Sequence, residues 1–265
     1  MLTATQLAIL ALVFFITSAV SVVTGSTSAI TVPVMFQFGI DARMAVATNM
    51  FALTFMSVGG TLPFLRSGVV NRQRLPILIA LTLAGSTIGA LLLLVIPKEI
   101  VPIFVSTAII GLAVFSMFYR SGGAEQAASV SSQKLELIGY VLTFIVGIYG
   151  GLFSGGYVTI LTAIFVAAFR MSFLEAIATT KLINIFSSGV ATLIFMWNGL
   201  VDYRLGLGLG LTMFAGAWLG ARYASRLGNL WLRRIYLTAV WLLGLKTLLF
   251  DVLRGHPATA PSHDN

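Results

Sequence analysis

The sequence predicts an all-α polytopic membrane protein made of two inverted repeats, each with about five hydrophobic segments and short broken helices at its start. Three observations predict this fold. The chain of 265 residues is 58% hydrophobic and 9% charged, and its mean hydropathy is +1.00. It contains several uncharged apolar runs of membrane-spanning length. Its two halves also align without a gap, while their loop charges run in opposite directions.

Ten hydrophobic segments are expected, in two sets of five with the same order of lengths. Residues 1–120 form the first membrane repeat, with segments near 6–23, 28–38, 44–64, 75–96 and 100–119. A polar connector follows at 121–134. Residues 135–252 form the second membrane repeat, with segments near 137–153, 157–169, 175–197, 205–225 and 231–250. The polar tail, 253–265, is expected to be disordered.

The repeat is visible when the sequence is shifted against itself, so that Thr48 falls on Thr179, 131 positions later. The motif AVAT, which ends at Thr48, then matches AIAT, and GVVN from Gly68 matches GLVD from Gly199. Two Gly-xxx-Gly pairs also coincide: Gly85 with Gly89, and Gly216 with Gly220. Such pairs predict close helix crossings, and the sequence leaves open whether these lie within one chain or across a homodimer.

Loop charges predict how the halves are oriented. The loop after the third segment is basic, but its counterpart is neutral; the residues are Arg66, Arg72 and Arg74 against Asp202 and Arg204. The next loop reverses the bias, with Lys98 and Glu99 against Arg222, Arg226, Arg233 and Arg234. Because basic loops face the cytoplasm, equivalent loops lie on opposite faces. Each half then crosses five times, or crosses three times and adds a re-entrant hairpin.

The charged and reactive residues exclude several classes of function. The net charge of +8 comes from Lys and Arg that orient the helices, so no nucleic-acid partner is expected. Cysteine is absent and both histidines lie in the tail, which argues against an enzyme, a metal site or a cofactor. All eight carboxylates map to loops, helix ends or the tail. A cation or metal transporter is therefore disfavoured, and it stays open as an alternative, together with a non-transporting scaffold.

One lysine lies well inside a hydrophobic segment. Lys181 is surrounded in the sequence by Thr179, Thr180 and Asn184, and at the bilayer centre a lysine costs about 2.5 to 3.5 kcal/mol on insertion scales. It is therefore expected to face a partner or a cavity, although snorkelling to the interface is an alternative. The equivalent stretch of the first half offers Thr48 and Asn49, so we predict an asymmetric substrate site.

Two glycine-containing breaks complete the predicted site. The first comprises Gly25, Ser26 and Ser28, and the second comprises Gly155, Gly156 and Tyr157, with Thr159 close by. Helices that restart after such breaks present free backbone N–H groups and the positive end of the helix dipole. A pocket rich in donors and poor in negative charge is suited to an anion.

The order of these motifs resembles the TauE/SafE (TSUP) family of sulfite and organosulfonate exporters. The resemblance rests on AVATNM from Ala45, GVVN, GIYGGLFSGG from Gly147, AIATTKLIN ending at Asn184, and GLVD, and it spans nearly the whole chain. It implies a multi-pass protein of the bacterial inner (plasma) membrane whose partner, besides the lipid bilayer, is a small sulfur-containing anion. Where the family has a run of glycines, this chain has Gly25-Ser26-Thr27-Ser28, which leaves sulfite and a larger sulfonate both open.

Overall fold

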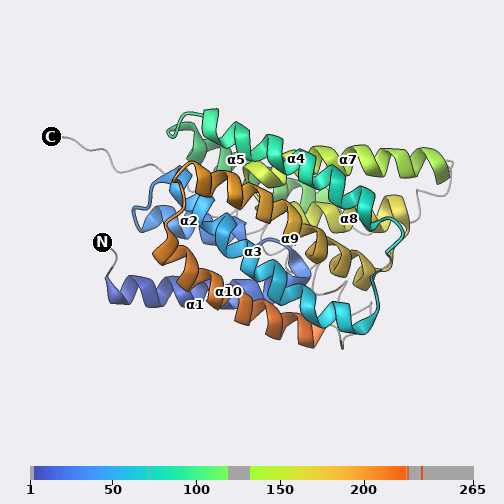
Figure 1. Cartoon of the computed structure of the whole chain (residues 1–265), viewed down its shortest axis with the longest axis horizontal. Helices are drawn as coiled ribbons and strands as arrows, with labels where there is room; N and C mark the ends of the chain where they lie inside the picture. Colours follow the sequence, from blue (N-terminus) through green and yellow to red (C-terminus); the bar gives the residue numbers. More distant parts are fainter. Residues whose placement is uncertain (1–2, 71, 119–131, 225, 227–233, 235–265) are drawn as a thin grey trace.

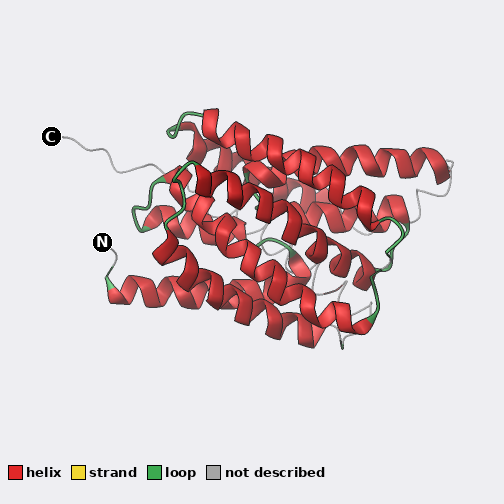
Figure 2. Cartoon of the chain, viewed as in Figure 1, coloured by secondary structure: helices red, strands yellow, loops and turns green. Residues whose placement is uncertain are grey.

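The computed structural model describes residues 3–70, 72–118, 132–224, 226 and 234. All regular structure in these residues is α-helical (Figures 1 and 2). The helices are α1 (Ala4–Thr24), α2 (Ser28–Gln37), α3 (Ala42–Ser67), α4 (Leu75–Val95), α5 (Ile100–Phe118), α7 (Ser132–Leu152), α8 (Tyr157–Phe169), α9 (Phe173–Trp197) and α10 (Tyr203–Ala224). They confirm nine of the ten predicted segments as helices. The last segment apart from residue 234, the connector up to residue 131 and the tail lie outside the described residues.

Five of these helices are long and apolar enough to cross a membrane: α1, α3, α4, α7 and α9. The outward faces of these helices are apolar, unlike the polar surface of a soluble protein. Large apolar side chains such as Leu12 and Leu193 are exposed, while hydroxyl and amide side chains are buried in the interior among apolar ones. This distribution and the helix lengths fit a multi-pass membrane protein.

Local capping explains where the helices begin and end. Thr3 and Gln6 form a capping box at the start of α1, with Thr3 N–H donating to Gln6 Oε1 over 2.8 Å. The Asp41 carboxylate accepts from two backbone N–H groups at the start of α3, and the Ser172 hydroxyl accepts from Glu175 N at the start of α9. Gly25 ends α1 in the left-handed conformation.

The two short helices do not extend the helices that precede them. A Cβ at Gly150 of α7 would lie 2.6 Å from Tyr157 Cε2 at the start of α8, and one at Gly139 would lie 2.8 Å from the Ala168 side chain near its end. α8 therefore folds back along α7 as a hairpin. Figure 1 shows the same course for α2, which returns toward the end of the bundle where α1 begins.

The long helices pack in pairs that join the two halves of the chain. α3 and α10 run in parallel, because the contacts between them advance along both helices in the same direction. Phe51 lies at Gly206, Phe55 at Gly210 and Gly59 at Phe214. α3 and α9 run antiparallel, because Ser57 contacts Asn184, whereas Thr54, earlier in α3, contacts Thr192, later in α9. The centre of the bundle is thus built from both halves.

Both Gly-xxx-Gly pairs are crossing points within this chain. Gly85 and Gly89 of α4 lie against α7, where an added Cβ at Gly85 would come within 2.6 Å of the Phe144 carbonyl oxygen. Gly216 and Gly220 of α10 lie in the same way against α1. Each pair joins a helix of one half to the first helix of the other half. Because these glycine pairs are used inside the chain, they do not support a homodimer. The homodimer itself stays a prediction.

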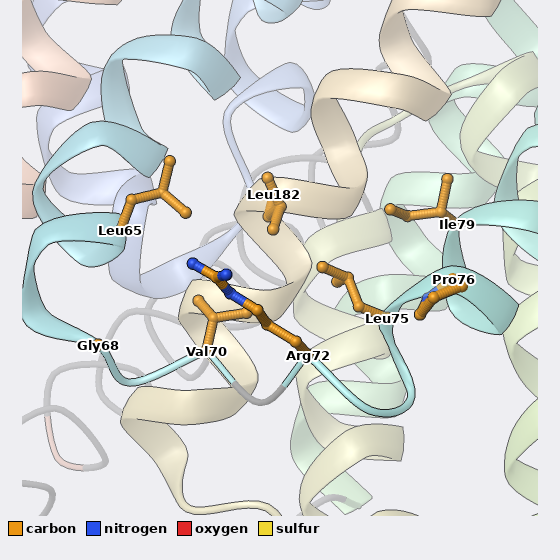
Figure 3. Close-up of a pocket in the computed structure, with 8 residues that line it drawn as sticks. All are labelled: Leu65, Gly68, Val70, Arg72, Leu75, Pro76, Ile79 and Leu182. Atoms are coloured by element: carbon orange, nitrogen blue, oxygen red, sulfur yellow. The ribbon is translucent and has the colours of Figure 1, made fainter.

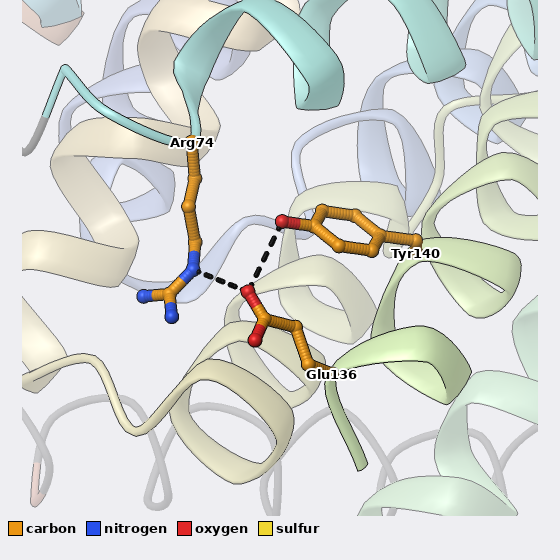
Figure 4. A network of polar contacts seen from close by, with 3 residues as sticks. All are labelled: Arg74, Glu136 and Tyr140. Carbon is orange, nitrogen blue, oxygen red and sulfur yellow. Dashed lines mark hydrogen bonds and ion pairs between the residues drawn. The ribbon is translucent and has the colours of Figure 1, made fainter. Parts of the chain in front are cut away.

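A polar network fastens α4 to α7 at one end of the bundle (Figure 4). Arg74 Nε lies 2.8 Å from Glu136 Oε1, and Tyr140 OH donates to the same oxygen over 3.2 Å. The Arg74 guanidinium also lies over the Phe169 ring, 5.6 Å from its centroid. Because Phe169 is the last residue of α8, the network connects the hairpin to α4.

The helix directions gather basic residues at one end of the bundle. α3 and α10 are parallel, so the loop after α3 and the end of α10 share this end, which carries Arg72, Arg74 and Arg222. Asp41 and Asp202, which precede α3 and α10, lie at the opposite end. We refer to the first of these as the basic end.

Candidate anion site

The two helix breaks meet in the interior of the bundle, where Figure 2 shows a short non-helical stretch among the helices. Gly25, which ends α1, packs on the first turn of α8: an added Cβ would lie 2.6 Å from Thr159 N. The Ser26 and Thr159 hydroxyl oxygens are 3.1 Å apart, and the Thr159 hydroxyl also donates to the Thr24 carbonyl. The sequence-predicted breaks therefore form one junction.

A chain of hydrogen bonds extends from this junction into α3. Ser28 Oγ lies 2.7 Å from Ser154 Oγ in the second break, and it accepts from Asn49 Nδ2 over 2.8 Å. Asn49 Oδ1 in turn accepts from the Thr31 hydroxyl over 2.7 Å. Ser154, next to Gly155, was missed at the level of sequence, although its position inside a glycine-rich break is a usable signal.

A second chain connects α8, α9 and α3. Asn184 Nδ2 donates to Ser57 Oγ over 2.6 Å, and Asn184 Oδ1 accepts from the Ser187 hydroxyl over 3.3 Å. Ser187 also receives the Tyr157 hydroxyl, with an oxygen–oxygen distance of 3.3 Å. Ser57 and Ser187 were not predicted. The spacing of Asn184 and Ser187, three residues apart on an apolar helix, is the signal that could have found Ser187.

Lys181 is buried at the same level and does not snorkel. Its side chain is 2% exposed, and Nζ donates to the Ser21 carbonyl over 3.2 Å. Gly60 of α3 makes room for it, since a Cβ there would lie 3.7 Å from Lys181 Cδ. The Ser21 carbonyl also accepts the Gly25 N–H over 2.8 Å. The ammonium therefore lies at the C-terminal, negative end of the α1 dipole, beside the first break.

No acidic side chain compensates Lys181 within the described residues. Arg74 and Glu136 form the ion pair found there, and they lie at the basic end. Among the buried polar side chains of the described ranges, Lys181 is the one of a charged residue type. A buried charge without an opposite charge is costly, so this position favours a negatively charged ligand.

The three predicted threonines have different surroundings. Thr180 Oγ1 lies 3.5 Å from Thr162 Oγ1 of α8, so it belongs to the polar interior. Thr179 Oγ1 is buried and has no hydrogen-bond partner among the described residues. Thr48 lies apart from the junction, because its hydroxyl accepts from Asp202 N over 3.0 Å and so fixes the loop before α10.

A cavity formed by described residues lies beside this interior (Figure 3). Its volume is about 670 Å³, and it is lined by Leu65, Gly68, Val70, Arg72, Leu75, Pro76, Ile79 and Leu182. It lies at the basic end, where the loop after α3 contributes to its lining, and none of the predicted site residues line it. Its wall includes Leu182, the residue after Lys181.

In the part of the chain that the structure describes, no group of three or more His, Asp or Glu side chains lies together.

The fold and its polar, donor-rich interior define a class, that of multi-pass membrane proteins with a buried site. The comparisons give the family. The family model described as "Sulfite exporter TauE/SafE" matches residues 10–247, so the chain belongs to the TauE/SafE family. This confirms the resemblance found in the sequence. No solved structure matches the chain.

Curated relatives carry transporter names. The chain is 31% identical over 224 residues to a "Probable membrane transporter protein ORF9" of Sinorhizobium, with 84% of each chain covered. It is 26% identical to a "Probable membrane transporter protein" of Haemophilus influenzae, over 83% of this chain and 84% of the relative. It is also 26% identical to the "Probable membrane transporter protein YfcA" of Escherichia coli K12, over 77% and 74%. The family is one of membrane transporters and not of enzymes.

Proposed function

We propose that this protein is a secondary transporter that exports a small sulfur-containing anion, such as sulfite, thiosulfate or an organosulfonate, across the bacterial inner membrane. The observation that carries the proposal is Lys181, a buried ammonium with no acidic partner in the described residues, next to the junction of the two helix breaks. Ser26, Ser28 and Thr159 add hydroxyl donors at that junction. Cationic and hydroxyl donors together suit an oxyanion.

The same interior argues against a cation as substrate. Cation pathways through membranes place Asp or Glu at depth, whereas the buried polar side chains of the described ranges are hydroxyls, amides and Lys181. A cation or metal bound there would be repelled by the lysine. The sequence alternative of a cation or metal transporter is therefore the weaker one.

Three backbone correspondences support two repeats that share one plan. Positive φ angles recur 131 positions apart, at Gly25 and Gly156, at Gly39 and Arg170, and at Gly68 and Gly199. Arg170 has a φ of 55° although it is not glycine, which indicates that the fold of the repeat imposes the turn there.

Helix directions support the inversion of one repeat. α3 and α9 are equivalent by the same shift of 131 positions, and they pack antiparallel across the centre. A side-chain hydrogen bond also recurs at equivalent positions. The Thr31 hydroxyl donates to the Asn49 amide oxygen in the first repeat, and the Thr162 and Thr180 hydroxyls pair in the second, with the partners 18 residues apart in each case. Antiparallel equivalent helices are what a two-fold axis in the membrane plane produces.

The mechanism follows from the position of the junction between the repeats. Ser26 and Ser28 belong to the first repeat, and Thr159 and Lys181 to the second. An anion bound among them would be held by both repeats. Rocking of one repeat against the other would then expose it to one face at a time, as in other transporters with broken helices at the midplane.

Charge predicts the direction of net movement. The basic end, with Arg72, Arg74 and Arg222, is assigned to the cytoplasm. Expelling one negative charge from a cytoplasm at negative potential gains about 2.3 kcal/mol per 100 mV. Outward movement of the anion therefore needs no coupling ion.

The test is anion flux in liposomes that contain the purified protein at imposed membrane potentials. Sulfite, thiosulfate and ethanesulfonate are each supplied, and export is expected to accelerate when the compartment holding the anion is made negative. Lys181→Met is expected to abolish the flux. Lys98→Met is the matched control, because Lys98 is exposed in the turn before α5. Flux of no anion, or flux indifferent to potential, would reject electrogenic export, and a scaffold role would become the better explanation.

A further inference from the structure

The cavity beside α9 has the composition of a binding site for an organic anion. Of the eight described residues that line it, Arg72 is charged and most of the others are aliphatic (Figure 3). Arg72 is exposed and has no ion pair or hydrogen bond within the described residues. Its guanidinium is directed into the space between Leu65, Val70 and Leu182. Among the described residues, a single cation at a partly open apolar pocket suits a ligand that is negative at one end and apolar at the other.

The size of the cavity supports this choice of ligand. Its volume of about 670 Å³ falls within the range of sites for small organic molecules, roughly 300 to 1,000 Å³. A bare inorganic oxyanion would leave the walls formed by Leu75, Ile79 and Leu182 without contact. An alkyl group attached to the anion would cover those walls and gain free energy from the apolar surface removed from water.

α3 and α9 border both the cavity and the buried lysine. Leu182 of the cavity wall follows Lys181 on α9, and Leu65 lies five residues after Gly60, whose backbone faces the Lys181 side chain. A shift of α3 against α9 would therefore act on both spaces.

We propose that this cavity is an antechamber at the basic end, in which Arg72 captures the anion before it reaches Lys181, and that its apolar lining selects an organosulfonate over an inorganic oxyanion. The proposal deepens the proposed function and rests on it for the onward step to Lys181. Capture in the cavity can be measured without transport, so the two can fail separately.

The absence of cysteine from the chain allows a direct test of capture. Leu182→Cys places one thiol on the α9 wall, and Ile79→Cys places one on the α4 wall as a second reporter. Each is labelled with sulfonatoethyl methanethiosulfonate, which is itself a small organosulfonate, and with the cationic trimethylammonioethyl reagent. Lys98→Cys, exposed at the opposite end, is the control for the intrinsic reactivity of the two reagents.

The anionic reagent is expected to label Leu182→Cys faster than the cationic one, relative to the Lys98→Cys control. Adding Arg72→Gln should reduce this ratio by roughly five- to tenfold, because the guanidinium attracts one reagent and repels the other. Arg72→Lys should preserve it. A ratio that Arg72→Gln leaves unchanged, or thiols at both reporter positions that neither reagent labels, would overturn the antechamber.

Protection tests the selection of an organic anion. Ethanesulfonate is expected to slow labelling of Leu182→Cys several-fold more than sulfate at equal ionic strength, and Arg72→Gln should remove this protection. Equal protection by both anions would overturn the selection by the apolar walls. If labelling behaves as expected while the liposomes carry no anion, the cavity binds organosulfonates and the proposed transport function is the part that fails.

Discussion

Lys181 donates from Nζ to the main-chain carbonyl of Ser21, 3.2 Å away and 160 positions earlier in the sequence. Both residues are buried, and the carbonyl belongs to the last turn of α1, just before the chain breaks at Gly25. The lysine of the second half thus depends on the helix break of the first. Because the lysine and its acceptor belong to different halves, any movement between the halves would change the surroundings of the Lys181 ammonium.

The stability of the ligand-free protein separates a binding lysine from a structural one. Because burial of a charge without an opposite charge costs free energy, an apolar side chain of similar length at this position is expected to be neutral or stabilising. Lys181→Met is therefore expected to keep or raise the unfolding temperature without anion, and to lose the rise that ethanesulfonate or thiosulfate gives the wild type. Thermal unfolding in detergent measures both. A mutant that unfolds earlier yet still responds to anions would make Lys181 a structural residue.

Gly25 in the first break and Gly39 after α2 form a matched pair of glycines. Gly25 and Gly39 have φ angles of 75° and 76°, so alanine is strained at both by about 1 to 2 kcal/mol. A Cβ at Gly39 meets nothing within 4 Å, whereas at Gly25 it would press on Thr159 N and the Val158 side chain. We expect Gly39→Ala to lower stability modestly and keep anion flux, and Gly25→Ala to abolish flux. If the two variants had equal flux, close contact between the two helix breaks would not be needed for transport.

Hydropathy and glycine position were sufficient to predict the helices. Apolar runs predicted α1, α3, α4 and α9 with ends within a few residues, because the bilayer selects length and composition directly. The two short segments were predicted as short helices near the start of each repeat, but length alone could not decide between crossing the membrane and folding back. The contact of Gly139 with Phe169, which closes the α7–α8 hairpin, depends on tertiary packing.

The candidate site was predicted in its residues but not in its connections. Lys181, Asn184 and Ser28 are visible as polar residues in apolar surroundings. Their partners include Ser57, Ser154 and the main-chain carbonyl of Ser21. A carbonyl is present at every position and leaves no mark in a sequence, and a serine in a membrane helix has little signal of its own. The assignment of these residues to an anion stays a prediction.

The ion pair at the basic end is expected to contribute little to stability. Arg74 and Glu136 are 35% and 31% exposed, and exposed pairs are worth about 0.2 to 1 kcal/mol. A double-mutant cycle with Arg74→Gln and Glu136→Gln should give a coupling free energy in that range, smaller at high salt. A coupling above about 2 kcal/mol that salt leaves unchanged would instead indicate a desolvated latch between α4 and the α7–α8 hairpin.

The Gly-xxx-Gly crossings are expected to be intolerant of even one methyl group. A Cβ at Gly89 would overlap the Ile148 carbonyl, and one at Gly220 would overlap the Ala19 carbonyl. Since backbone atoms must move to relieve these overlaps, each Gly→Ala change should cost about 1 to 3 kcal/mol. Gly208→Ala is the control, because a Cβ there meets nothing within 4 Å and alanine favours the helix. The unfolding temperature should fall for Gly89→Ala and Gly220→Ala, and it should stay level or rise for Gly208→Ala. If the first two variants instead kept their stability and dissociated a dimer, the crossings would belong to contacts between chains.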